Sequence, residues 1–375
     1  MSFWLDSVPE FAREQLKSWG LEEKSRGVDL VLRILSYPVL PPKDLHETFS
    51  TYRGPKGHFA PIRCVMPARR QSSATIVLLH GATPAADYHP GMLMIARVLA
   101  SGGYRVLVPQ VPPLKRLRIT EESSAWLLSF QNWMLEDEET SNDNISWVAM
   151  SFGGTLLLKT TLEQAFVECP PRAILTYGSF CNLESTYDYL LSGLLHEPDG
   201  TRYQTPHAWG KIVVFLNYLH RIDAGYDTRD IESVLRQYEY DDEVGAQKVM
   251  RNLSASDRAI CTAIIDSEST PELERLLDLI RGVARDDILN LSPEFWGDRV
   301  TTKVYVMHGM TDSMVPYTEA LALHRTLPAS QLFVSDLAKH SEVKAGALSR
   351  FEVFSEMAGM ARFLGEFVSE IARDG

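Results

Sequence analysis

An apolar run that ends in a serine and two glycines is the feature that most constrains the fold of this chain. Residues 145–150 predict a buried strand, Ser151 follows directly, and Gly153 and Gly154 open a stretch at 153–168 that predicts a helix. A sharp strand-to-helix turn needs small residues because the backbone approaches its neighbours closely. The free N–H groups at the start of the helix carry a partial positive charge, which favours an anion beside the serine. The pattern therefore predicts a serine hydroxyl held exposed at a strand end, as a nucleophile requires.

Two later strand-like runs are also followed by side chains that can act together with a serine. Asp312 follows the run at 304–309, and His340 follows the run at 331–335. The carboxyl ends of parallel strands open at one edge of a sheet, where open α/β folds place their sites. A neutral serine hydroxyl is a weak nucleophile and needs an adjacent base. We therefore expect His340 to accept the proton of Ser151, and Asp312 to orient the imidazole.

The acid has two alternative interpretations. Asp336 lies only four residues before His340, and we expect it to face solvent. Asp312 or Thr311 could instead cap the helix that is expected after Pro316. The His-Gly-x-x-Asp context of Asp312 favours Asp312 as the acid.

A further motif ends the apolar strand predicted at 74–80. With it, the chain resembles the α/β-hydrolase superfamily from about residue 46 to the C-terminus, including the order Ser, Asp, His along the chain. The resemblance rests on four motifs, which are His80-Gly81-Ala82, the turn at Ser151, His308-Gly309 with Asp312 and Val315-Pro316, and His340.

The resemblance implies the α/β-hydrolase fold, a mostly parallel, doubly wound sheet with an inserted helical cap. It also implies that the backbone N–H groups of Ala82 and Phe152 form an oxyanion hole. His80 and His308 are then expected to be structural residues at strand ends. One departure is Ala149, where the superfamily's turn usually has glycine.

The sequence divides into three parts. Residues 1–45 predict an amphipathic helical extension, and residues 46–179 with 299–375 predict the α/β core. Residues 180–298 interrupt the alternation of strands and helices with helical stretches and no strong strand. We expect this segment, which lies between the last strands of the core, to form the helical cap.

Within these parts the residue spacing makes finer predictions. The core should begin with an antiparallel hairpin of residues 46–52 and 59–66. The cap aromatics Trp209, Phe215 and Tyr218 could line an apolar pocket or pack in the interior. The extension has residues at helical spacing that should face the core, namely Phe11, Gln15, Trp19, Val28, Leu32 and Leu35.

The charge of the chain is concentrated in the expected cap. The net charge is −12, which argues against nucleic acid as a partner. Residues 180–298 contain 11 Lys and Arg against 22 Asp and Glu, so this segment carries −11 of the total. Such an uneven distribution indicates a separate structural unit.

Other signals are absent from the sequence. The four cysteines have no paired spacing, so we expect no disulfide framework and no metal site. The chain has neither a dinucleotide fingerprint nor a glycine-rich phosphate loop, and we expect no cofactor. No run is long enough to span a membrane, and the N-terminus lacks the pattern of a secretory signal. We therefore expect a cytoplasmic protein, with its oligomeric state left open.

These observations lead to one functional hypothesis with alternatives. We expect a serine hydrolase that cleaves a small-molecule carboxylic ester through an acyl-enzyme on Ser151. A thioesterase, a lipase or a serine peptidase would use the same three residues. A protein of a different class, a non-catalytic binding protein on the same scaffold, is disfavoured because such proteins usually lose a member of the triad. The sequence does not specify the acyl chain or the leaving group.

Overall fold

The computed structural model describes the chain in six stretches, residues 21–69, 74–137, 140, 144–197, 199–335 and 350–372. Two residues discussed above, Asp336 and His340, lie outside these stretches. The same holds for the part of the expected N-terminal extension that precedes residue 21, including Phe11, Gln15 and Trp19.

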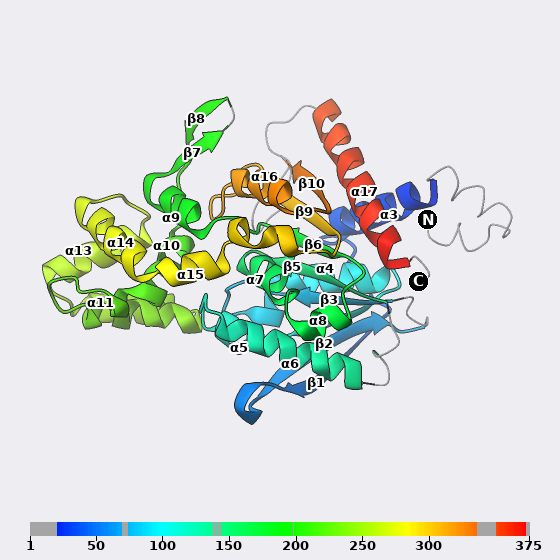
Figure 1. Ribbon diagram of the computed structural model, residues 1–375, viewed down its shortest axis with the longest axis horizontal. Helices are drawn as coiled ribbons and strands as arrows, with labels where there is room; N and C mark the ends of the chain where they lie inside the picture. The colour runs from blue at the N-terminus through cyan, green and yellow to red at the C-terminus, as the bar shows by residue number, and fades with distance from the viewer. Residues whose placement is uncertain are drawn as a thin grey trace, which may run out of the picture.

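An eight-stranded sheet forms the centre of the molecule, in the order β1-β2-β4-β3-β5-β6-β9-β10 (Figure 1). The pairs β1–β2 and β2–β4 are antiparallel, and the other pairs are parallel. The predicted N-terminal hairpin and the mostly parallel sheet are therefore confirmed. The strands are β1 (Leu45–Arg53), β2 (Phe59–Pro67), β3 (Thr75–Leu79), β4 (Arg105–Pro109), β5 (Ile145–Met150), β6 (Ile174–Tyr177), β9 (Val304–Gly309) and β10 (Ser330–Ser335).

Helices cover both faces of the sheet, so each central strand is buried on both sides. Two consecutive residues of β5 show this, because Trp147 packs in the hydrophobic core on one face of the sheet and Val148 in the core on the other face. The core of Val148 includes α3 (Leu21–Ser36), α4 (Pro90–Ser101) and α17 (Arg350–Ala372). The core of Trp147 includes α6 (Glu122–Glu136), α7 (Phe152–Thr160), α8 (Gln164–Glu168) and α16 (Tyr317–Thr326), with the short α5 (Pro112–Lys115) beside them.

Helix α3 packs on α17 with a different face from the one that the sequence predicted. Val28, Leu32 and Leu35 are 37–47% exposed, whereas Leu30 is buried. The crossing is close at Gly27, where a Cβ atom would lie 1.7 Å from the carbonyl oxygen of Ala361. Because apolar residues occur on both sides of α3, their spacing alone did not identify the buried side.

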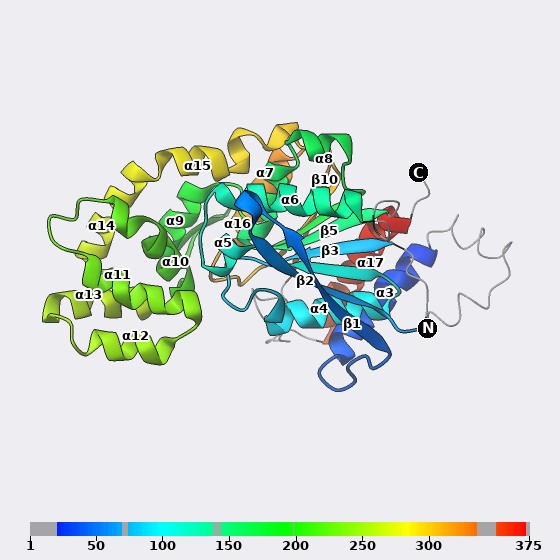
Figure 2. The same ribbon diagram turned by 90° about the horizontal axis from the view of Figure 1, so that it is seen from below.

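The segment between β6 and β9 lies at one end of the molecule, away from α3 and α17 (Figure 1, Figure 2). It is mainly helical, as predicted. Its helices are α9 (Leu183–Ser192), α10 (Ala208–Tyr218), α11 (Arg229–Leu235), α12 (Glu243–Met250), α13 (Ala255–Ile265), α14 (Pro271–Val283) and α15 (Arg285–Leu291).

The prediction that this segment has no strong strand was incomplete. An antiparallel hairpin of β7 (Leu194–Glu197) and β8 (Gly200–Tyr203) follows α9. Both strands are four residues long and largely solvent-exposed, with Leu195 as the buried exception. Short strands of this kind lack the alternation of apolar and polar residues that identifies a half-buried strand. In the part of the chain that the structure describes, no helix is both long and apolar enough to cross a bilayer.

Candidate active site

Ser151 occupies a strained turn between β5 and α7. Its φ of 51° and ψ of −133° lie in a region that residues other than glycine rarely adopt. Hydrogen bonds fix this backbone, because Ser151 N donates to the Tyr177 carbonyl (2.7 Å) and Ser179 Oγ donates to the Ser151 carbonyl (2.8 Å). Ala149 is fully buried in β5, so the residue that departs from the superfamily's motif is accommodated in the strand. The sequence therefore predicted this turn correctly.

The two glycines after Ser151 are required by close contacts. A Cβ atom on Gly153 would lie 2.4 Å from the carbonyl oxygen of His80. A Cβ atom on Gly154 would lie 2.1 Å from Ser179 Oγ. The start of α7 is thus packed directly against the end of β3, which brings the turn and the loop after His80 together.

The loop of residues 80–89 follows β3 beside this turn, and it is called the oxyanion loop after the role expected for Ala82. His80 is fully buried, and its Nε2 accepts a hydrogen bond from Val111 N (3.1 Å). Its Nδ1 therefore carries the proton and donates to the Gly81 carbonyl (2.7 Å). Burial lowers the pKa of His80 to about 4, so the ring stays neutral near pH 7. His80 is a structural residue that orients the loop containing Ala82.

Buried charges fix the far end of the oxyanion loop. The Asp87 carboxylate is 2% exposed and accepts hydrogen bonds from Arg63 Nε (3.1 Å) and Gln110 Nε2 (2.5 Å). Arg63 is also buried, and it forms a second ion pair with Glu47 at 3.0 Å. These contacts connect the loop to β1, β2 and the end of β4, all of which belong to the sheet.

The loop of residues 310–316 follows β9, and it is called the acid loop after the role expected for Asp312. Asp312 is 1% exposed, and its Oδ1 accepts hydrogen bonds from Met314 N (2.8 Å) and Val315 N (3.1 Å). Its Oδ2 lies 3.4 Å from His308 Nε2, which donates to the Val315 carbonyl at 2.8 Å. The alternative in which Asp312 or Thr311 caps a helix is wrong, because α16 follows Pro316 and has no side-chain cap.

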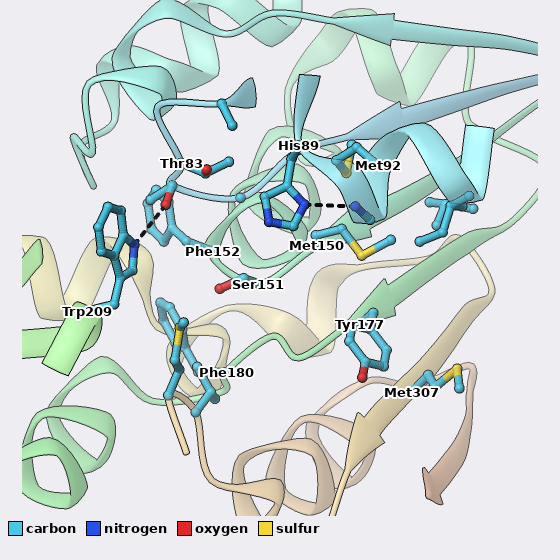
Figure 3. A pocket seen from close by; sticks show the side chains of 18 of the residues that line it. Thr83, His89, Met92, Met150, Ser151, Phe152, Tyr177, Phe180, Trp209 and Met307 are labelled. Atoms are coloured by element: carbon cyan, nitrogen blue, oxygen red, sulfur yellow. Dashed lines mark hydrogen bonds between the residues drawn. The ribbon is translucent and has the colours of Figure 1, made fainter. Parts of the chain in front are cut away.

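A cavity of about 650 Å³ lies over Ser151 and is lined largely by apolar side chains. Figure 3 shows Ser151 within it, with Trp209 and Phe180 on one side and His89 on another. Trp209 contributes to the lining, whereas Phe215 and Tyr218 do not and are buried in the interior. The pocket interpretation of the cap aromatics therefore holds for Trp209 alone. Other lining residues include Ala82, Phe152, Leu183, Leu190, Val213 and Met314.

Two histidines in the cavity lining were missed by the sequence analysis. His89 Nδ1 accepts a hydrogen bond from Gly91 N at the start of α4 (3.2 Å). His207 Nδ1 accepts one from Trp209 N at the start of α10 (3.1 Å). Both residues directly precede a helix. Their position before a predicted helix could have identified them in the sequence, because a side-chain acceptor there satisfies a free backbone N–H group.

Four of the five predicted site residues follow strands at one edge of the sheet. Ala82, Ser151 and Phe152 line one cavity, and Asp312 is buried in the loop at the same edge of the sheet. The fifth residue, His340, is outside the described residues. Within the described stretches there is no group of three or more His, Cys, Asp or Glu residues that could hold a metal ion.

The strand order and the strained serine turn after β5 define the α/β-hydrolase fold. No protein-family model matches the sequence, and no curated protein matches it by sequence comparison.

Similar solved structures include the esterase domain of a Rhodothermus marinus protein (TM-score 0.44, 17% identity, 86% of this chain and 96% of that one). The Pyrococcus furiosus esterase Pf2001 has a TM-score of 0.47 at 13% identity, over 88% of this chain and 96% of that one. The Pyrococcus horikoshii acylaminoacyl peptidase has a TM-score of 0.49 at 11% identity, over 91% of this chain but only 44% of that one. At such identities these similarities do not identify the reaction.

Proposed function

We propose that the protein is a serine hydrolase that cleaves a small-molecule carboxylic ester through an acyl-enzyme on Ser151. The observation that carries this proposal is the left-handed φ of Ser151 at the start of α7, over a largely apolar cavity. Backbone strain of this kind persists where the surrounding structure holds it, and it clusters at active sites. A structural turn would not need a serine in this conformation facing a cavity.

In this mechanism the hydroxyl of Ser151 attacks the ester carbonyl while His340 accepts its proton. The developing oxyanion is stabilised by the backbone N–H groups of Ala82 and Phe152. Support for Phe152 comes from its position as the first residue of α7, where an N–H has no partner within the helix. His340 then returns the proton to the leaving alcohol and activates the water that releases the acid. Asp312 orients the imidazole and stabilises its charged form.

We also propose that residues 180–298 are a cap domain that forms one wall of the substrate pocket. The apolar lining contributed by Phe180, Leu183, Leu190, Trp209 and Val213 favours an apolar group on the substrate. We favour an ester over a peptide because, among the residues that the structure describes, the lining has a single acidic side chain, the exposed Asp241, to bind a substrate amine. A thioester substrate would use the same groups. The four cysteines form no disulfide, which supports a cytoplasmic location.

A covalent probe tests the proposal most directly. We expect a fluorophosphonate to label one serine per chain, and Ser151→Ala to abolish labelling while the melting temperature stays near that of the wild type. Ser146→Ala is the matched control, because Ser146 is a fully buried serine in β5, the strand that leads into the Ser151 turn. Labelling that persists in Ser151→Ala would disprove the assignment. A series of p-nitrophenyl esters of increasing chain length would then define the acyl group.

A further inference from the structure

Residues 180–298, between β6 and β9, are called the insertion here, and a short part of them connects the two loops on either side of Ser151. This bridging segment, residues 204–209, runs from the end of β8 into the first turn of α10. At one end Gln204 Nε2 donates to the Asp312 carbonyl (2.7 Å) and to the Thr311 carbonyl (3.3 Å). In the middle His207 N donates to the Ser313 carbonyl (2.8 Å). At the other end Trp209 Nε1 donates to the Ala82 carbonyl (3.4 Å), as Figure 3 shows.

The amide of Gln204 is fixed in its orientation. Its Oε1 accepts a hydrogen bond from Arg202 (3.3 Å), so its Nε2 must face the acid loop. Its backbone N donates to the Gly193 carbonyl (2.8 Å), which ties the residue to the end of α9. Because both ends of the side chain are engaged, Gln204 can hold the acid loop in one place.

The hairpin also contacts the first residue of α16, directly after the acid loop. Glu197 in β7 pairs with Arg202 in β8 at 3.0 Å. The same carboxylate accepts a hydrogen bond from the hydroxyl of Tyr317 (3.2 Å), the first residue of α16. The insertion therefore contacts the chain before, within and after the turn that Asp312 forms.

We infer that Gln204 is a positioning residue that sets the place of Asp312 through its backbone carbonyl. The inference rests on the proposed function. Asp312 satisfies its Oδ1 within its own loop, so its position relative to Ser151 depends on what holds that loop. Strand β9 fixes the loop where it begins, His308 holds its end through the Val315 carbonyl, and Gln204 holds the carbonyl of Asp312 itself. The insertion thus takes part in placing the acid as well as in lining the pocket.

Two substitutions of Gln204 distinguish positioning from a merely structural contact. Gln204→Ala removes the donor to both carbonyls and should lower kcat about tenfold with little change in KM, which is the size expected when the shorter of the two hydrogen bonds dominates. Gln204→Glu keeps the length of the side chain but directs a carboxylate at two carbonyl oxygens, so its kcat at pH 8 should fall further than that of the alanine variant. Thr201→Ala, in exposed β8, is the control and should retain wild-type kcat.

The rate of fluorophosphonate labelling of Ser151 gives a readout that does not depend on ester binding. We expect the labelling rates to follow the order wild type, Gln204→Ala, Gln204→Glu, at melting temperatures within a few degrees of each other. Unchanged kcat and labelling in both variants, or equal losses in the two, would overturn the role of Gln204 while leaving Ser151 as the nucleophile. If the wild type itself is not labelled at Ser151, the proposed function fails instead.

Discussion

The two loops beside Ser151 are held in different ways. The oxyanion loop is fixed from within the sheet, by the buried Arg63–Asp87 ion pair and by the neutral ring of His80. The acid loop is fixed in part from outside the sheet, by Gln204 and by other residues of the insertion. The first loop is therefore held mainly by the core, with one 3.4 Å hydrogen bond from Trp209 of the insertion, whereas the second is held by both His308 of the core and Gln204 of the insertion.

Because the two loops are held differently, substitutions near each of them should have different effects. Changes behind the oxyanion loop break contacts of the core and should appear mainly as lost stability. Changes at the junction of the insertion with α16 should alter the acid loop at a smaller cost in stability. Glu319 belongs to this junction, because its carboxylate on α16 accepts hydrogen bonds from Cys181 N (3.0 Å), Asn182 N (2.8 Å) and Ser185 Oγ (2.6 Å).

The largest expected effect concerns the acid itself. Asp312→Asn should lower kcat by about 10⁴-fold, since an asparagine can no longer hold the imidazole in the required tautomer. Asp336→Asn should stay within a few-fold of the wild type. The measurement is steady-state kinetics of both variants with one p-nitrophenyl ester. The opposite ranking would show that Asp336 is the acid and that the acid loop is not part of the machinery.

The next effect concerns the oxyanion loop. Arg63→Met leaves the buried Asp87 carboxylate without its ion pair, which should cost about 3–5 kcal/mol of unfolding free energy. Arg97→Met is the matched control, because Arg97 pairs with Glu47 near the surface and should cost about 0–1 kcal/mol. Urea unfolding of the two variants gives both values. Similar losses would mean that the buried pair does not anchor this loop.

The junction with the insertion should show a pH dependence. Burial raises the pKa of Glu319, against the hydrogen bonds from Ser185, Asn182 and Cys181, which lower it. A raised pKa in the folded state means that the folded protein binds this proton more tightly than the unfolded chain. The resulting stability is complete below the ordinary value of 4.5 and is lost as the pH rises through the raised pKa.

Glu319→Gln removes this titration. It also replaces the carboxylate, which accepts hydrogen bonds from Cys181, Asn182 and Ser185, with an amide that has only one acceptor oxygen. We expect it to cost about 1–3 kcal/mol at low pH. The difference in unfolding free energy between wild type and variant should then shrink as the pH rises from 4.5 towards neutral. Urea unfolding at a series of pH values measures this difference. A difference that stays constant with pH would show that Glu319 has the same pKa in the folded and unfolded states.

Much of this arrangement could be predicted from the sequence because it depends on local patterns. The turn at Ser151 follows from an apolar run and two glycines, and the hairpin at β1 and β2 follows from alternation. The contacts that hold the loops could not be predicted. Gln204 and Asp312, for example, are 108 residues apart, and nothing in the sequence around either residue indicates that they form a hydrogen bond. The buried face of α3 was predicted wrongly for a related reason, since it depends on the close approach of Gly27 to α17.

The smallest expected effect concerns the charge of the insertion, which carries −11 of the total charge of −12. If part of that charge lies around the entrance to the cavity, its potential should slow the encounter with anionic esters relative to matched neutral ones. Salt should reduce this difference, because the Debye length falls from about 10 Å at 0.1 M to about 3 Å at 1 M. We expect the ratio of kcat/KM between a neutral ester and its carboxylate-bearing analogue to decrease a few-fold over this range.

Asp241 offers a way to sharpen this last test, because it is an exposed acid that also lines the cavity. Asp241→Asn should lower the neutral-to-anionic ratio at low salt and have little effect at 1 M salt. Asp227→Asn is the control, since Asp227 is exposed, pairs with Arg229 and does not line the cavity. If the ratio of kcat/KM is independent of salt and equal in both variants and the wild type, the acids of the insertion face bulk solvent and do not affect the encounter with the substrate. In that case the insertion would influence the site through Gln204 and the pocket wall, and not through its charge.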